Sequence, residues 1–130
     1  MTDAITRARA LIGVPWRHQG RNIAVGIDCV GLIVHALQLA DDYTAYGRDP
    51  HDGQLEAELA RRFGAPLPAT CMQPGDVVAM AFAGPVRHVG LVAGSALGLS
   101  LIHTDSSVGQ VTEHPIDARW QRRIRGVYRP

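Results

Sequence analysis

The feature that most constrains this chain is an apolar segment, Cys29–Ala40, which directly follows a glycine-containing loop. Its residues are apolar nearly all round a helix, and only Gly31, His35 and Gln38 form a small or polar stripe. A helix that is apolar on most of its surface is usually enclosed by the rest of the protein. We therefore expect a central, buried helix over residues 29–40.

The start of this helix carries an acidic residue followed by a cysteine. Asp28 is a candidate N-cap, because its carboxylate can accept a hydrogen bond from a backbone N–H of the first turn. Cys29 then lies where unpaired N–H groups and the helix dipole favour a thiolate, which lowers the pKa of the thiol. Taken alone, Cys29 is equally compatible with a small apolar core residue.

Composition places the chain among ordinary globular proteins. It has 130 residues, 46% of them hydrophobic and 19% charged, so we expect one domain over 1–130 that needs no metal or disulfide to fold. A net charge of +1 gives no electrostatic argument for binding nucleic acid or an anionic membrane. Besides Cys29 the chain has one cysteine, Cys71, which is expected to be structural.

No targeting or membrane segment is visible in the sequence. The apolar runs are shorter than the roughly 20 residues that span a bilayer. Residues 1–9 lack a basic segment followed by an apolar core, so no signal peptide is predicted. We expect synthesis in the cytosol, with any export following another route.

The hydrophobic pattern predicts helices in the first half of the chain and strands in the second. The expected helices cover residues 3–12, 29–40 and 54–63, with a polar loop over 16–22 and a turn-rich connection over 43–53. The expected strands cover 76–82, 89–93, 99–103, 110–113 and 125–128, with a helical turn over 116–120. Helices followed by an antiparallel sheet form an α+β fold.

Two histidines flank the strands of a predicted hairpin. His88 opens one strand and His103 ends the next, so antiparallel pairing through the glycine-containing turn over 94–98 brings both to one end of the hairpin. A cysteine at a helix N-terminus facing two adjacent imidazoles can form a Cys–His–His unit of nucleophile, base and orienting residue. Cys29, His88 and His103 are therefore the candidate catalytic residues.

Four motifs in order along the chain strengthen this interpretation. They are Asp28–Leu32, Gln73–Val78, Arg87–Val92 and Leu101–His103. Together they resemble the NlpC family of papain-like cell-wall cysteine peptidases. The segment Gly13–Gln19 further resembles the branch of tail-associated cell-wall peptidases that phages and prophages encode.

The resemblance implies a fold, a reaction and roles for individual residues. It implies a papain-like fold in which Cys29 is the nucleophile, His88 the base and later acid, and His103 the orienting residue. The substrate would be the stem peptide of peptidoglycan, cleaved at the link from D-γ-glutamate to a diamino acid. Asp28 would help to hold the free amine of that peptide, and Trp16 and His18 are expected beside it in the cleft.

The chain also departs from the family pattern at two positions. Val30 stands where the family usually has Ser, and Trp16 stands where a Tyr usually helps to stabilise the oxyanion. The backbone N–H of Cys29 remains available for the oxyanion. The partners implied are peptidoglycan and phage tail-tip proteins, with the protein acting on the cell wall as part of a phage-like particle; nucleic acid and membrane are not expected.

Three other hypotheses remain at this point. The chain could be a tail-tip assembly protein that keeps the fold without hydrolysis, or a papain-like acyltransferase, which would require an apolar cleft or a membrane-facing segment. A zinc site built from Cys29, His88 and His103 has suitable ligand types, but no metal-binding spacing supports it, and no cofactor is expected. Of the other histidines, His35 is expected on the polar stripe of the buried helix, and His51 and His114 in loops.

Overall fold

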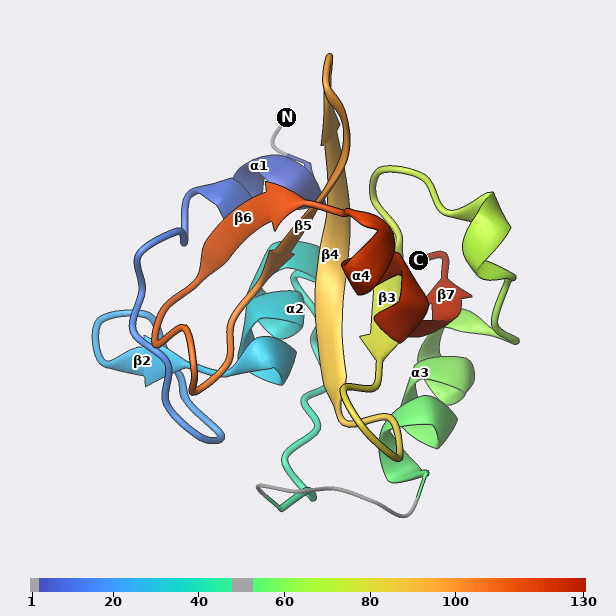
Figure 1. The fold of residues 1–130 in the computed structure, drawn as a ribbon. Helices are drawn as coiled ribbons and strands as arrows, with labels where there is room; N and C mark the ends of the chain where they lie inside the picture. The colour runs from blue at the N-terminus through green and yellow to red at the C-terminus, as the bar shows by residue number, and fades with distance from the viewer. Residues whose placement is uncertain (1–2, 48–52) are drawn as a thin grey trace.

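The second half of the chain forms an antiparallel sheet, in a computed structural model that describes residues 3–47 and 53–130. The strands are β3 (Val77–Met80), β4 (His88–Ser95), β5 (Gly98–His103), β6 (Thr112–Pro115) and β7 (Ile124–Tyr128). Their order across the sheet is β6-β5-β4-β3-β7 (Figure 1). β4 and β5 form the expected hairpin, in which Leu91 lies opposite Ile102 and Ser95 opposite Gly98.

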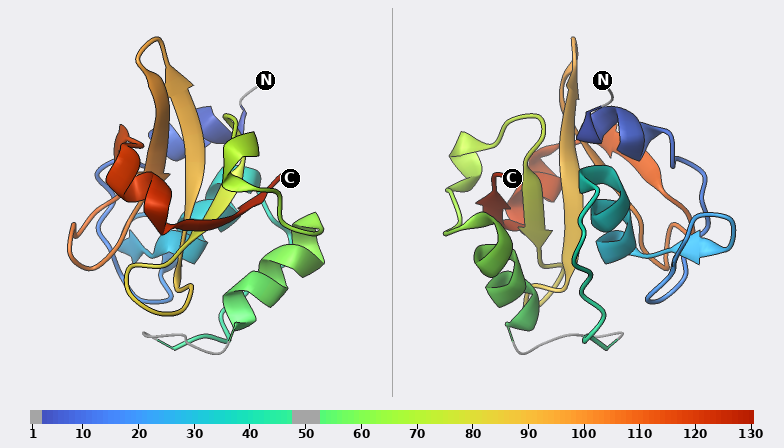
Figure 2. Two further views of the ribbon diagram at one scale, coloured as in Figure 1. Left: turned by 45° about the vertical axis from the view of Figure 1, so that its right-hand side comes forward. Right: turned by 180° about the vertical axis from the view of Figure 1, so that it is seen from behind.

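Helices lie on both sides of this sheet. The helices are α1 (Ala4–Arg9), α2 (Cys29–Leu37), α3 (Gln54–Phe63) and α4 (Ala118–Arg123), with a 3-10 helix η1 (Ala69–Cys71). α2 packs on β4 with α1 beside it, and α4 lies on the opposite side of the sheet (Figure 1); the rear view in Figure 2 brings α1 and α2 to the front. The predicted α+β class is therefore confirmed. None of the helices in the described ranges has the length and apolarity needed to cross a bilayer.

The alternation of side chains along the strands divides the core in two. On the α2 side, the central strands contribute a larger cluster that includes Val77, Leu91 and Ile102 and packs against all three N-terminal helices. On the α4 side, a smaller cluster includes Val92 and Leu101 and packs against α4. Both faces of the sheet are therefore buried, which explains why β4 reads as an almost continuous apolar run.

The buried helix forms as expected but ends three residues early. Leu32 and Ala36 are fully buried in it. Gln38 adopts a left-handed backbone conformation with φ 53°, and its N–H bonds to the His35 carbonyl, so the helix stops at Leu37 and not at Ala40.

Glycine is required where the loop over residues 17–20 crosses the first turn of α2. A Cβ on Gly31 would lie 2.4 Å from the carbonyl oxygen of Gly20, and a Cβ on Gly20 would lie 2.2 Å from that of Gly26. Because neither glycine has a Cβ, the loop can lie directly against the N-terminus of α2. The loop is followed by a short hairpin, β1 (Arg21–Asn22) with β2 (Gly26–Ile27), and its first strand lies within the polar loop predicted over 16–22.

Two expectations about histidines change. His114 is not in a loop: it lies in β6, opposite Leu101 of β5. The reason is that β6 extends to Pro115, beyond the predicted end at 113. His35 lies on α2 as expected and contacts the carbonyl oxygen of Arg21 through Nε2 at 2.6 Å. His51 lies outside the described residues.

Candidate active site

Cys29 occupies the N-terminus of α2 and faces a cavity of about 270 Å³. The Asp28 side chain caps the helix by accepting a hydrogen bond from the Gly31 N–H at 2.9 Å, as predicted. Cys29 is partly buried, and the same cavity is lined by His88 at the start of β4. The fold therefore brings Cys29 and His88, which are 59 positions apart in the sequence, to one site.

His88 and His103 form the predicted pair. Nε2 of His88 lies 2.9 Å from Nδ1 of His103, and both side chains are buried. The pairing follows from the antiparallel hairpin, because His88 begins β4 and His103 ends β5, which places both at the same end of the hairpin. His103 itself is not among the residues that line the cavity described above, and it contacts Nε2 of His88. Its role as the orienting residue stays a prediction.

A third histidine, which the sequence analysis placed in a loop, extends this pair. Nε2 of His114 lies 2.8 Å from Nε2 of His103, and Nδ1 of His114 lies 2.8 Å from the carbonyl oxygen of Pro115. The indole of Trp120 covers both rings, with its centroid 4.9 Å from that of His103 and 4.6 Å from that of His114. Extending the predicted strand by two residues would have placed His114 beside β5 and indicated this contact.

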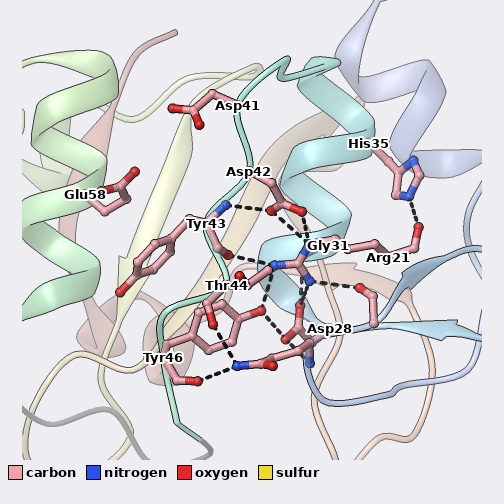
Figure 3. A network of polar contacts seen from close by, with 12 residues as sticks. Arg21, Asp28, Gly31, His35, Asp41, Asp42, Tyr43, Thr44, Tyr46 and Glu58 are labelled. Atoms are coloured by element: carbon pink, nitrogen blue, oxygen red, sulfur yellow. Dashed lines mark hydrogen bonds and ion pairs between the residues drawn. The ribbon is translucent and has the colours of Figure 1, made fainter.

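The carboxylate of Asp28 is the centre of a polar network (Figure 3). Besides the Gly31 N–H, Oδ1 accepts a hydrogen bond from Arg21 at 2.9 Å, and Oδ2 accepts from the Gln19 N–H at 2.8 Å and the Tyr46 hydroxyl at 2.5 Å. A carboxylate has about four acceptor positions, so these four donors fill them. The role of Asp28 in holding a substrate amine stays a prediction, and it would require one of these donors to move.

The electrostatic environment of Cys29 differs from the one expected. Burial, and after it the charge on Asp28, raise the pKa of the Cys29 thiol, although the backbone N–H groups of Val89, Val30 and Cys29 itself act in the opposite direction. The prediction of a lowered pKa at the helix N-terminus is thus wrong for the protein without substrate. Desolvation of the sulfur and the adjacent carboxylate outweigh the N–H groups, so the resting state is the neutral thiol.

The pKa values of His88 and His103 are also shifted, in the direction that favours the neutral ring. Burial, followed by the charge on His103, lowers the pKa of His88, and burial, followed by the charge on His114, lowers the pKa of His103 to about 4. A neutral imidazole has a nitrogen that can accept a proton. The directions of these pKa shifts favour a thiol beside a neutral base over a thiolate–imidazolium ion pair.

The two histidines and Asp105 are poorly suited to a metal ion. His88, His103 and Asp105 place possible ligand atoms within 4.8 Å of one another. However, both ring nitrogens of His103 are already engaged by neighbouring histidines, so it could ligate a metal only by giving up one of those contacts. The arrangement fits proton transfer better than metal binding.

Trp16 and His18 both line the cavity, where the sequence analysis placed them. His18 makes an edge contact with the ring of Tyr46 at 5.8 Å. Binding of substrate by these two residues stays a prediction. The cavity wall also includes Arg87 and Asp105, which the sequence analysis did not select and which give the wall charges of both signs.

Comparison with known proteins agrees with this geometry. A model described as the NlpC/P60 family matches residues 13–129. The chain is similar to the structure of an NlpC/P60 family protein from Bacillus cereus, with 21% identity and a TM-score of 0.66 over 98% of this chain and 39% of that one. It is similar to the NlpC/p60 domain of the peptidoglycan hydrolase SagA, with 18% identity and a TM-score of 0.65 over 96% and 94%.

A third similar structure is a lipoprotein-like NLP/P60 family protein from Staphylococcus aureus, with 17% identity and a TM-score of 0.66 over 97% of this chain and 39% of that one. The chain thus spans about two fifths of the Bacillus and Staphylococcus proteins and nearly all of the SagA domain. Curated proteins gave no significant match. These likenesses confirm the predicted fold.

Proposed function

The chain belongs to the NlpC/P60 family, and from that premise we propose that it is a cysteine peptidase that hydrolyses amide bonds in the stem peptides of peptidoglycan. The observation that carries the proposal is that Cys29 and His88 line one cavity, with Nδ1 of His103 at 2.9 Å from Nε2 of His88. The structure of a peptidoglycan hydrolase domain among the similar folds supports the choice of substrate.

The reaction follows from the neutral resting state. His88 takes the proton of the Cys29 thiol as the sulfur forms a bond to the amide carbonyl carbon, so that the charged pair arises only during attack. The N–H of Cys29 can donate to the oxyanion. His88 then gives the proton to the leaving amine, the C–N bond breaks, and water hydrolyses the thioester with His88 again acting as base.

Two further parts of the function can be proposed, namely which amide bond is cleaved and how the enzyme reaches the cell wall. We propose cleavage between D-γ-glutamate and a diamino acid, because a substrate with carboxylates and amines suits a cavity wall that carries Arg87 and Asp105. We also propose that the enzyme reaches the cell wall as part of a phage or prophage tail, with tail-tip proteins as partners. The resemblance of Gly13–Gln19 to the tail-associated branch supports that setting.

The charged wall of the cavity argues against an acyltransferase that acts on lipids, which would need an apolar cleft. Digestion of purified peptidoglycan, followed by mass analysis of the released peptides, tests the peptidase proposal. We expect the wild type to release stem-peptide fragments and Cys29→Ala to reduce the rate by more than about 10³-fold. Cys71→Ala is the matched control, because Cys71 is exposed on η1, and it should keep full activity.

Release of the same fragments by Cys29→Ala would overturn the proposal. A wild type that releases nothing, also when tested with assembled tail particles, would favour the assembly protein that keeps the fold without hydrolysis.

A further inference from the structure

The hydrogen bonds among three histidines determine which ring nitrogen of each histidine carries a hydrogen. Three contacts of 2.8 to 2.9 Å connect His88, His103, His114 and the carbonyl oxygen of Pro115 in one line. Each contact between two imidazoles needs one nitrogen that carries hydrogen and one that does not. With neutral rings, the hydrogens along this line therefore have only two consistent arrangements. The group at the outer end, next to His114, decides which of the two is present.

The outer end is fixed by a group that cannot donate. The carbonyl oxygen of Pro115 only accepts, so Nδ1 of His114 carries the hydrogen. In a neutral ring, Nε2 of His114 is then an acceptor, and the hydrogen of that contact belongs to Nε2 of His103. Nδ1 of His103 is left as an acceptor for the hydrogen on Nε2 of His88.

At the other end of the line is the ring of His88, whose Nδ1 would accept the Cys29 proton in the proposed reaction. Because Nε2 of His88 carries its hydrogen and is engaged by His103, Nδ1 of His88 is the ring nitrogen without a proton. We propose that His114 is a positioning residue: through His103 it holds His88 in the tautomer whose Nδ1 can accept the Cys29 proton. This inference rests on the proposed peptidase function for its purpose, but not for its geometry.

The surroundings of His114 suit this role. Its ring packs on Trp120, over which the Arg123 guanidinium lies at 4.5 Å from the ring centroid. Glu113, its neighbour in β6, bonds instead to Arg9 and Ser100. No carboxylate among the described residues is hydrogen-bonded to His114. Its only polar contacts there are therefore those to His103 and Pro115.

A hydrogen-bond donor in place of the His114 acceptor would reverse the hydrogen positions along the line. If position 114 donated to Nε2 of His103, then Nδ1 of His103 would carry the hydrogen and donate it to Nε2 of His88. Nδ1 of His88 would then be protonated and unable to act as a base. A residue at position 114 that can only donate should thus lower kcat more than a residue that makes no hydrogen bond.

Three substitutions separate these cases. His114→Gln keeps an acceptor, because the amide oxygen can face His103; His114→Leu removes the hydrogen bond; and His114→Lys can only donate. We expect kcat on stem peptide to fall less than about fivefold for Gln, about 10- to 100-fold for Leu and more than 100-fold for Lys, with KM little changed. A wrongly held tautomer can cost about 10⁴-fold in serine proteases, which sets the scale.

A second measurement needs no substrate. Long-range ¹H–¹⁵N correlation spectra of the wild type, labelled at histidine, should show hydrogen on Nε2 of His88 and His103 and on Nδ1 of His114. Hydrogen on Nδ1 of His103 in the wild type would overturn the inference, and so would equal loss of kcat in all three variants. If the tautomers are as expected but peptidoglycan is not cleaved, the proposed function fails while the hydrogen-bond assignment stands.

Discussion

Replacing Asp28 by Asn tests whether the four hydrogen bonds to this carboxylate stabilise the protein. The side chain is only 3% exposed, and each of its oxygens accepts two hydrogen bonds. In the Asn variant, the amide oxygen can keep the contacts of Oδ1 with Gly31 and Arg21. The NH₂ group then replaces Oδ2 and meets the Gln19 N–H and the Tyr46 hydroxyl, which are both donors.

The cost follows from those two lost contacts. A hydrogen bond to a charged group contributes about 1.5–3 kcal/mol, and a buried donor left without an acceptor costs about 1–3 kcal/mol. The Tyr46 hydroxyl can rotate and the Gln19 N–H is only partly buried, so we expect a loss of about 2–4 kcal/mol in the free energy of unfolding. Since a domain of this kind has roughly 5–15 kcal/mol in total, the variant should fold but be clearly weakened.

Urea unfolding followed by circular dichroism measures the loss. Asp117→Asn is the matched control, because Asp117 caps α4 through the Trp120 N–H, is exposed, and Asn caps a helix about as well as Asp. We expect a change within about 0.5 kcal/mol for the control. If Asp28→Asn is no more destabilising than Asp117→Asn, the argument from filled acceptor positions is refuted.

Three further outcomes follow from the structure. Burial and the adjacent carboxylate raise the pKa of Cys29, so iodoacetamide at pH 7 should modify Cys29 more slowly than the exposed Cys71, as measured by mass spectrometry of tryptic peptides; faster modification of Cys29 would contradict this. Burial lowers the pKa of His103 to about 4, below the value of about 6.5 in an unfolded chain, so the unfolded state binds more protons between these values. The free energy of unfolding should therefore fall as the pH drops from 6.5 towards 4, by up to about 1.4 kcal/mol per pH unit from this residue, and His103→Asn should show a shallower dependence. Gly31→Ala should cost about 1–3 kcal/mol, because its Cβ would lie 2.4 Å from a loop carbonyl oxygen, whereas Gly47→Ala, with nothing within 4 Å, should be nearly neutral in the same urea assay.

The parts of the site that could be predicted are those encoded by local patterns. The capping role of Asp28 follows from its place before an apolar helix. The approach of His88 to His103 follows from antiparallel pairing, which brings the start of β4 beside the end of β5. The helix over 54–63 was also predicted with its observed bounds, because its apolar residues Leu55, Leu59 and Phe63 repeat at helical spacing.

The parts that were missed depend on contacts between distant segments. Tyr46 reaches Asp28 from a connection without regular structure, and no pattern in the sequence indicates that contact. The pKa of Cys29 was predicted in the wrong direction because the helix N-terminus is visible in the sequence, whereas the burial of the sulfur is a property of the fold. His114 was missed because the pattern ended its strand too early.

The strand order has a consequence for how the protein is made. β3 pairs on one side with β4, which follows it closely, and on the other with β7, so that Val77 lies opposite Tyr128. A ribosome that has released β3 to β5 has released His88 and His103, but not yet Trp120, which covers the histidines, or the strand that completes the sheet. Because the contacts of highest sequence separation form last, a nascent chain would hold an unfinished site until β7 emerges. The strand order thus leaves Cys29 and His88 in an incomplete fold until translation has passed β7.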